Sequence, residues 1–314
     1  MSDCSSPQTL MEAIRHFSDR DVCLTFVAEL RWPNGVQCPR CQHKATSFLK
    51  TRRIWKCKGC KKQFSAKVGT IFEHSPIPLD KWLTAMWMLT NCKNGISSYE
   101  VHRAIGVTQK TAWFLLHRIR LAMQDGNFEK LSGEVEADET FVGGLSKNMH
   151  KSRRAKAIHG TGGTGKTVAM GILQRKGKIK TMVVPNVQRE TLHAEIRKHV
   201  EPGSELFTDA WTAYRGLAPE YLHQIIDHAV SYVEGSVHTN GIENFWTLLK
   251  RSLKGTYTHC DPCHLFRYLD EQSFRFNERQ RNDARRFVGV LGQIAGKRLK
   301  YDELTGKSLM VAAV

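Results

Sequence analysis

The sequence predicts a multidomain α+β protein in which a small metal-bound ribbon and a helical domain precede an α/β domain. Three patterns predict it: two C-x2-C pairs near the N-terminus, apolar residues at helical spacing over residues 79–119, and alternating or β-branched stretches from residue 134 onward. The expected domains are a helical segment at 1–30, a ribbon at 31–74, a helical domain at 75–128, an α/β domain at 129–282, and a C-terminal helix and tail at 283–314.

The chain is strongly basic, with 47 Lys and Arg against 30 Asp and Glu and a formal net charge of +17 over 314 residues. This excess favours a polyanionic partner, first nucleic acid and second an anionic membrane surface, although some basic soluble enzymes share it. No apolar run approaches the about 18 residues that span a membrane, and the first residues lack the pattern of a secretion signal. We therefore expect a cytoplasmic protein without a membrane partner.

Four of the nine cysteines form the pairs CPRC, from Cys38, and CKGC, from Cys57, with 15 residues between the pairs. Each pair turns two thiolates toward one point, so two pairs close a tetrahedral zinc site. Strand-like pieces at 46–49 and 53–56 lie between them, which predicts a zinc ribbon that depends on structural Zn²⁺. Four free thiols are the alternative. The expected zinc ligands are Cys38, Cys41, Cys57 and Cys60.

Basic residues surround these pairs, among them Arg52 and Arg53. They predict that the ribbon touches DNA backbone. The other five cysteines are expected to be unpaired, which agrees with a reducing compartment.

The stretch 96–120 has the spacing of two helices joined by a tight turn. Ser97 or Ser98 can cap a first helix. Gly106 lies at the turn, and Thr108 can cap a second helix. This predicts a helix-turn-helix whose second helix enters the major groove, with a plain helical hairpin as the alternative. The residues expected outside, as candidates for DNA contacts, are Gln109, Lys110, Trp113 and His117.

The stretch from Gly160 to Thr167 fits G-x-x-x-x-G-K-T, the pattern of a phosphate-binding loop. Such a loop must follow a strand and open a helix, so that helix N–H groups face the phosphates. Here a basic loop precedes the match, and a strand-like stretch containing Val168 and Ile172 comes after it. We therefore predict a flexible loop tip and no ATP, with Lys166 left to meet a DNA phosphate.

From residue 133 the predicted order is three strands, a helix, a strand, a second helix, a fifth strand and a long helix. The corresponding stretches are 133–144, 166–175, 178–185, 186–200, 203–211, 212–218, 221–228 and 241–255. This is the order of a ribonuclease-H-like (RNase-H-like) mixed sheet flanked by helices.

Three acidic residues fall where such a fold carries out chemistry. Asp138 lies on the first strand, Asp209 at the end of the fourth, and Glu243 in the first turns of the long helix. Carboxylates are the hard ligands that Mg²⁺ prefers, and two ions so held serve an in-line phosphoryl displacement. Lys250, two turns after Glu243, can reach a phosphate. The glutamates at 136 and 139 compete with Asp138, and an Asp at a strand end can simply cap a helix.

Together these features resemble the DDE-type transposases of bacterial insertion sequences. The stretches that carry the resemblance are EADETFVGG, LFTDAWTAY, HTNGIENFWTLLKR and YLDEQSFRFNER. The likeness is to the group in which a zinc ribbon and a helix-turn-helix precede an integrase-like catalytic domain. It covers residues 17–282, and its motifs are specific as a set but weak singly.

The resemblance implies that Asp138 and Asp209 are the two aspartates of the catalytic motif. Either Asn240 or Glu243 fills the third position. Glu243 is favoured because a carboxylate is the better Mg²⁺ ligand and because Lys250 follows at the family's spacing. The resemblance also implies two Mg²⁺ or Mn²⁺ ions, with Asp138, Asp209 and Glu243 as their ligands.

The same resemblance implies the reaction and the partners. Metal-activated water cuts a strand at the element's end, and the freed 3′-OH attacks target DNA, without ATP. The partners are double-stranded DNA, as terminal inverted repeats and target, and further copies of the chain in at least a dimer. The implied location is the bacterial cytoplasm, in association with the nucleoid. His238 would orient the site.

A DNA-binding regulator derived from a transposase, without cleavage activity, is the main alternative, and the presence of all three acids argues against it. An RNase-H-like nuclease without strand transfer is another, which the tandem DNA-reading modules disfavour. Cys260 and Cys263 have metal-like spacing but no second pair nearby, so we expect thiols on a turn.

Overall fold

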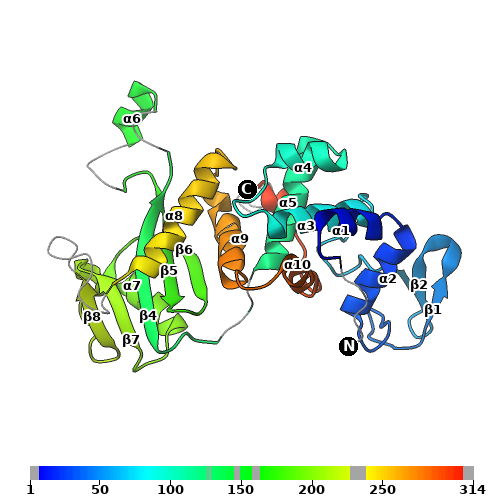
Figure 1. Ribbon diagram of the computed structural model, residues 1–314, viewed down its shortest axis with the longest axis horizontal. Helices are drawn as coiled ribbons and strands as arrows, with labels where there is room; N and C mark the ends of the chain where they lie inside the picture. The colour runs from blue at the N-terminus through cyan, green and yellow to red at the C-terminus, as the bar shows by residue number, and fades with distance from the viewer. Residues whose placement is uncertain are drawn as a thin grey trace, which may run out of the picture. The chain divides into compact units, whose positions relative to one another are not determined.

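The computed structural model describes residues 7–124, 126, 129–144, 149–157, 163–226 and 238–306. The chain divides into two compact units (Figure 1). Unit 1 comprises residues 1–124 and 279–314, and unit 2 comprises residues 125–278. None of the helices in the described ranges is both long and apolar enough to cross a membrane.

Unit 1 combines a small antiparallel sheet with helices. Its helices are α1 (Leu10–His16), α2 (Arg20–Arg31), α3 (Leu79–Asn91), α4 (Ser98–Ile105), α5 (Gln109–Met123), α10 (Asp283–Leu291) and α11 (Tyr301–Leu304). Its strands are β1 (Thr46–Leu49), β2 (Ile54–Cys57) and β3 (Gln63–Phe64), with the 3-10 turn η1 (Lys50–Arg52) after β1. They pair in the order β1-β2-β3, which gives the ribbon that the cysteine spacing predicted.

A few aromatic rings hold the ribbon together. The ring of Trp55 lies 5.1 Å from that of Phe48, 5.6 Å from that of Trp32 and 6.1 Å from that of Phe64. Because this cluster is small, we expect the ribbon to need further stabilisation from its cysteines.

The C-terminal helix belongs to the core of unit 1. Phe287 of α10 is fully buried, with its ring 5.1 Å from that of Trp87 on α3 and 5.7 Å from that of Phe17. Ile71 also donates its N–H to the carbonyl of Ile294 at 3.1 Å. We predicted a separate segment at 283–314. Its described residues instead pack with the N-terminal half of the chain.

The helix pair α4–α5 follows the predicted caps. Ser97 Oγ accepts the N–H of Glu100 at 3.2 Å, and the Glu100 carboxylate accepts the N–H of Ser97 at 2.8 Å. Gly106 ends α4 at φ +62°, in the left-handed region that favours glycine. Thr108 then accepts the N–H of Thr111 at the start of α5.

Unit 2 is built on a five-stranded mixed sheet. Its strands are β4 (Glu134–Val142), β5 (Thr167–Gln174), β6 (Ile179–Val184), β7 (Glu205–Asp209) and β8 (Leu222–Ile226). They lie in the order β6-β5-β4-β7-β8. β5 is antiparallel to β4 and β6, whereas β7 is parallel to β4 and β8.

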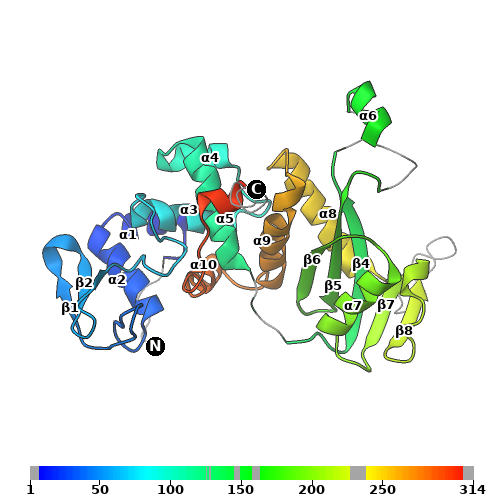
Figure 2. The ribbon, with the colours of Figure 1, turned by 180° about the vertical axis from the view of Figure 1, so that it is seen from behind.

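Helices flank both faces of this sheet (Figures 1 and 2). They are α7 (Arg189–His199) on one face and α8 (Asn240–Gly255) with α9 (Leu265–Asn277) on the other. Successive side chains of β5 point to opposite faces of the sheet. Met170 packs in the apolar core on the α7 face, and Ala169 packs in the apolar core on the α8–α9 face. The predicted mixed sheet flanked by helices is confirmed.

Two local predictions for unit 2 were wrong. The basic stretch predicted to be a loop contains the short helix α6 (Lys151–Ala157), whose Lys, Arg and Ala residues are good helix formers. The predicted second helix at 212–218 is only a 3-10 turn, η3 (Thr212–Tyr214), because Gly216 adopts φ +94° and ends it. A further 3-10 turn, η4 (Pro262–His264), precedes α9.

Candidate active site

The structure brings Asp138 and Asp209 together on neighbouring parallel strands. β4 and β7 pair with Glu136 opposite Phe207. Two residues further along the same register, Asp138 lies opposite Asp209, and both side chains point to the same face of the sheet. α8 covers that face, since the indole Nε1 of Trp246 donates to Asp138 Oδ2 at 3.0 Å.

The site concentrates negative charge in a partly buried place. Burial, together with the charges of Glu139 and then Asp209, raises the pKa of Asp138 to about 7. Burial also raises the pKa of Glu139, whose carboxylate accepts a hydrogen bond from the hydroxyl of Tyr214 in the opposite core. A divalent cation relieves such crowding, because it favours the charged form of every carboxylate near it.

A buried ion pair anchors the start of α8 to the sheet. Glu136 is only 1% exposed, and its Oε1 accepts from Arg175 Nε at 2.9 Å. Its Oε2 accepts the backbone N–H of Ile242 at 2.9 Å. Arg175 also donates to the carbonyl of His238 at 2.6 Å, and its guanidinium stacks 3.8 Å from the ring centre of Phe207. Glu136 is therefore engaged in holding α8, which leaves Asp138 as the acid of β4 that faces Asp209.

Two glycines allow α8 to lie close to the sheet. A Cβ on Gly241 would come within 2.7 Å of Leu173 Cδ2 and 2.8 Å of Glu136 Oε2. A Cβ on Gly171 of β5 would come within 2.8 Å of the Trp246 ring. Both distances are shorter than real Cβ atoms keep, so a side chain at either position would force the neighbouring side chains to shift.

Glu243 and Lys250 lie on the exposed side of α8, away from Gly241. Gly241 meets Leu173 of β5 and Glu136 of β4, and successive helix residues turn by about 100°, so Glu243 points about 200° around the helix from Gly241. Glu243 is exposed, as are Lys250 and Asn240, and its Oε1 accepts from Thr239 Oγ1 at 3.0 Å.

The carboxylate groups of the three predicted magnesium ligands, Asp138, Asp209 and Glu243, do not all lie within 4.8 Å of one another. Within the described ranges, the single set of three or more metal-type side chains that lie within 4.8 Å of one another is a set of four cysteines. The aspartate pair is assembled, but Glu243 must approach it further for all three to hold one ion. The donor set, made only of hard carboxylate oxygens, fits Mg²⁺ or Mn²⁺.

The four cysteines match the zinc prediction. All four Sγ atoms lie within 4.8 Å of one another, with Cys38–Cys60 at 3.7 Å and Cys41–Cys57 at 3.6 Å. Four thiolates at these separations suit a tetrahedral ion with no open position, so the cluster supports structural Zn²⁺. No such cluster in the described ranges includes Cys260 or Cys263.

The residues predicted to face outward on α5 do so only in part. Lys110 is exposed, whereas Gln109 and Trp113 are half-buried. Gln109 donates from its amide to Ser98 Oγ at 2.9 Å. His117 is fully buried with its ring 4.6 Å from that of Trp113, so its predicted contact with DNA is wrong. The error arises because the helix is also covered on the side that we expected to be open.

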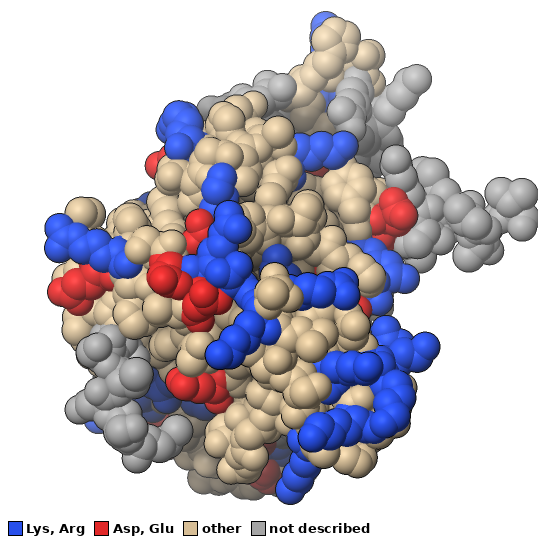
Figure 3. Space-filling view, turned by 90° about the vertical axis from the view of Figure 1, so that its right-hand side faces the viewer, with Lys and Arg blue, Asp and Glu red and all other residues tan. Residues whose placement is uncertain are grey.

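The ribbon surface is basic. Figure 3 shows Lys and Arg side chains over much of the face on which Figure 1 draws β1 and β2. Arg52 donates to Gln63 Oε1 at 2.9 Å, and Arg53 makes two hydrogen bonds to Asp21, at 2.5 and 3.0 Å. The exposed basic residues of the ribbon are Arg40, Lys44, Lys50, Arg52, Arg53, Lys56, Lys58, Lys61 and Lys62.

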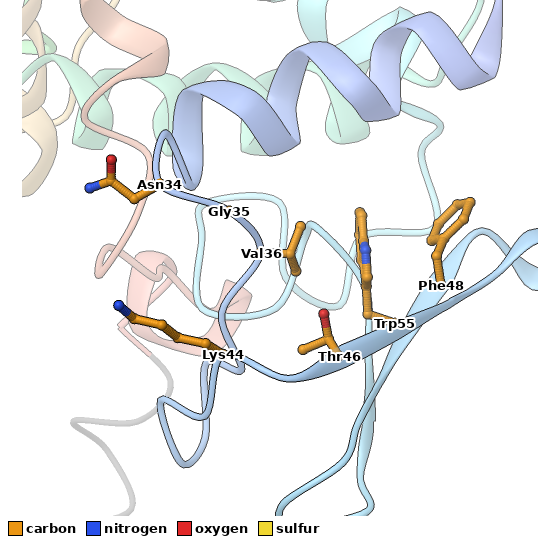
Figure 4. Close-up of a pocket in the computed structure, with 7 residues that line it drawn as sticks. All are labelled: Asn34, Gly35, Val36, Lys44, Thr46, Phe48 and Trp55. Atoms are coloured by element: carbon orange, nitrogen blue, oxygen red, sulfur yellow. The ribbon is translucent and has the colours of Figure 1, made fainter.

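The ribbon also carries a small hollow of about 330 Å³ beside its aromatic cluster. Figure 4 shows Val36, Thr46 and Trp55 converging at its centre, while the Lys44 side chain extends away from them. The full lining is Asn34, Gly35, Val36, Lys44, Thr46, Phe48 and Trp55.

The G-x-x-x-x-G-K-T match leads into a strand, as predicted. Its first residues lie outside the described ranges. Lys166 ends a turn, closed by its N–H to the carbonyl of Gly163 at 2.9 Å, and β5 begins at Thr167. A strand therefore stands where a phosphate-binding loop needs the N-terminus of a helix. Lys166 is half-buried.

The patterns in the sequence did not predict the roles of Arg175 and Tyr214 or the exposure of Trp211. Glu136 offered one usable signal, because an acid between Val135 and Ala137 on a buried strand requires a buried partner. Nothing in the local sequence identifies that partner as Arg175, which lies 39 residues away.

Comparisons with known proteins show similarity to transposases. The family model for an ISXO2-like transposase domain matches residues 130–277, and that for a transposase zinc-ribbon domain matches residues 18–63. The chain is 39% identical over 120 residues to an uncharacterized transposase-like protein of Haemophilus influenzae, covering 38% of this chain and 94% of that protein. It is 26% identical over 256 residues to an uncharacterized protein in transposable element ISH50 of Halobacterium salinarum, covering 77% of this chain and 86% of that protein.

Proposed function

Because the chain belongs to the transposase family with a zinc ribbon and an ISXO2-like transposase domain, we propose that it moves an insertion sequence by DNA cleavage and joining. It binds the terminal inverted repeats of its element and cuts a strand at each end in a reaction that requires a divalent metal ion. The freed 3′-OH is then joined to target DNA.

The aspartate pair is the observation that carries this proposal. Asp138 and Asp209 sit in register on adjacent parallel strands, and burial, together with the charges of Glu139 and Asp209, raises the pKa of Asp138 to about 7. Such a pair is unfavourable without a cation and suited to one. Mg²⁺ or Mn²⁺ bound here would supply an activated water and neutralise charge on the phosphate.

The residues around the pair have separable roles in the proposal. Glu243 is the third acid, reached by a shift of α8 toward β7, and the amide oxygen of Asn240 is a weaker ligand in the same helical turn. Lys250 holds a DNA phosphate as a point charge. Trp246 fixes the orientation of Asp138 through its indole N–H. His238 and Glu136, through Arg175, set the start of the helix that bears Glu243.

We further propose that unit 2 has the RNase-H-like fold. Its strand order β6-β5-β4-β7-β8, with β5 antiparallel to its neighbours and β7 and β8 parallel to β4, supports this assignment. The two aspartates on the central strands and the acid on a late helix are consistent with it.

Unit 1 is proposed to bind the DNA ends. α4 and α5 act as a helix-turn-helix, with Gln109, Lys110 and Trp113 toward the groove. The zinc ribbon, held by its four cysteines, contacts backbone phosphates through residues such as Arg52 and Arg53. Lys166 of unit 2 adds a further phosphate contact.

Both ends of an element must be held together for joining, so the active form on DNA is at least a dimer. The reaction exchanges phosphodiester bonds and needs no ATP. The predicted domain boundaries at 1–30, 31–74, 75–128, 129–282 and 283–314 remain our proposal for the functional parts of the chain.

A cleavage assay tests this function. The full-length protein is mixed with labelled duplex DNA carrying the inverted repeats that flank the gene, with Mg²⁺ or Mn²⁺. We expect a metal-dependent nick at the repeat boundary that leaves a 3′-OH and is lost in Asp209→Asn. The matched control is Asp261→Asn, at an exposed aspartate of the same unit, which should nick normally. Specific binding without a nick under either metal would instead favour a DNA-binding regulator derived from a transposase.

A further inference from the structure

An open hollow of about 510 Å³ is lined in part by Trp211, two residues after Asp209, and has no role in the chemistry proposed above. Its walls come from the start of α7 and from the turn after β7. Its lining includes Gln188, Arg189, Trp211, Thr212 and Arg215. The combination of one large aromatic ring with two arginines is what distinguishes it.

Trp211 is exposed and yet fixed in relation to Asp209. Its side chain is 49% exposed, which is unusual for the largest apolar residue. Its backbone N–H donates to Asp209 Oδ1 at 3.1 Å, which fixes the backbone of Trp211 relative to the proposed catalytic carboxylate. An exposed indole that projects from this backbone is a surface on which a flat ring can stack.

Trp211 lies only two residues after Asp209 in the chain. Two residues of chain span at most about 7 Å, so the Cα atoms of Trp211 and Asp209 lie within that distance of each other. A nucleotide next to a phosphate held at Asp209 therefore lies within reach of the indole. Bases stack on aromatic side chains with little regard to sequence, because every base has a π-face.

The charge of the hollow suits the same ligand. Arg189 and Arg215 are both exposed at its edge, and Glu190 is the acid among its lining residues. Arginine offers several N–H donors in one plane and matches phosphate oxygens. An apolar peptide would leave these two guanidinium groups without a matching partner.

We propose that this hollow receives an unstacked nucleotide of the strand being cut, with its base on Trp211 and its phosphate on Arg189 and Arg215. This inference rests on the proposed function, since it assumes that DNA is held at Asp209. Moving a base out of the helix requires unpairing and unstacking, which the contact with the indole offsets.

The test uses full-length protein and duplexes carrying the flanking inverted repeat, either fully paired or with one mismatch beside the cut. Trp211→Ala is compared with Trp211→Phe and with the control Phe266→Ala, at an exposed aromatic residue of α9 in the same unit. Nicking rates are measured in Mg²⁺. In Ca²⁺, the fluorescence of 2-aminopurine placed at each nucleotide beside the cut reports unstacking without cleavage.

Base stacking of about 1–3 kcal/mol corresponds to a slowing of about 5-fold to 150-fold for Trp211→Ala on paired DNA. The mismatch should recover most of that loss, because the base no longer has to be unpaired. Trp211→Phe and Phe266→Ala should stay near the wild-type rate. In Ca²⁺, wild-type protein but not Trp211→Ala should change the 2-aminopurine signal at one position.

Other outcomes separate this inference from the proposed function. A Trp211-dependent fluorescence change without nicking supports the binding of a nucleotide in the hollow and contradicts the cleavage function. If the wild-type protein nicks and Trp211→Ala slows nicking equally on paired and mismatched DNA, the inference is overturned. Trp211 then has a structural role or contacts another copy of the protein. Normal nicking by Trp211→Ala, or DNA binding with no fluorescence change at any position, also overturns it.

Discussion

At the scale of single residues, Gly241 lies in the first turn of α8 with no room for a side chain. A Cβ there would come within 2.7 Å of Leu173 and 2.8 Å of Glu136, both of which are buried. We expect Gly241→Ala to push α8 from the sheet and lower the free energy of unfolding by about 1–3 kcal/mol, as overpacked cores do. Urea denaturation measures the stability, and the nicking assay should show a slower rate.

The same helix supplies a matched control. Gly255 ends α8, and a Cβ there would meet nothing within 4 Å. Because alanine forms helices better than glycine by up to about 1 kcal/mol, Gly255→Ala should be neutral or stabilising and should nick normally. Equal destabilisation by the two changes would mean that the close approach of Gly241 to the sheet does not matter.

His223 links the stability of unit 2 to pH. Burial, together with the charge of His193, lowers the pKa of His223 below its ordinary value of 6.5. The unfolded chain therefore binds this proton more readily, so the contribution of His223 to stability is complete above about pH 6.5 and declines as the pH falls. His223→Gln cannot titrate but can still bond to Thr208, which lies 2.9 Å from the ring nitrogen.

We expect the drop in Tm between about pH 7 and pH 5 to be smaller for His223→Gln than for the wild type. Thermal unfolding followed by circular dichroism measures it. His259→Gln, at an exposed histidine, serves as the control and should retain the wild-type drop. An unchanged drop in His223→Gln would show that this imidazole takes no part in the pH response.

At the scale of elements, the ion pair between Glu136 and Arg175 joins β4, β5 and the start of α8. Arg175→Met would leave the Glu136 carboxylate buried without its cation, which typically costs about 3–5 kcal/mol. The double change Glu136→Gln with Arg175→Met should cost less, because no charge remains buried. Urea denaturation of the single and double variants measures this difference.

Arg197 offers a comparison at the surface of the same unit. It pairs with Glu220 at 2.6 Å, with 51% and 38% of the two side chains exposed. Water and salt screen such an exposed pair, so it contributes little to stability and Arg197→Met should be nearly neutral. If Arg175→Met were equally mild, α8 would be held by its apolar face alone.

The sequence predicted those elements whose signals lie within a few neighbouring residues, and it did not predict contacts between distant segments of the chain. The α4–α5 pair followed its caps, and the five strands followed their apolar patterns, because both signals lie within a few residues. The aspartate pair followed from strand order. The burial of His117 and the packing of Phe287 in unit 1 depend on segments far away in the chain, which no local pattern reports.

At the scale of the whole molecule, the two compact units differ in what stabilises them. Unit 2 has an apolar core on each face of its sheet. The ribbon of unit 1 has a small aromatic cluster and four cysteines with Sγ atoms within 4.8 Å of one another. Structural zinc contributes directly to the folding of such small domains. Removing it should therefore affect the ribbon and leave the sheet of unit 2 folded.

We expect a zinc chelator to abolish hydrogen-exchange protection in β1–β3 and to weaken DNA binding, while β4–β8 stay protected. Cys57→Ser, which removes one thiolate of the cluster, should have the same effect. Cys263→Ser, at an exposed cysteine outside the cluster, should leave both units protected. Simultaneous loss of protection in β4–β8 would mean that the two units unfold as one. Protection of β1–β3 that survives both the chelator and Cys57→Ser would mean that the aromatic cluster around Trp55 suffices to fold the ribbon.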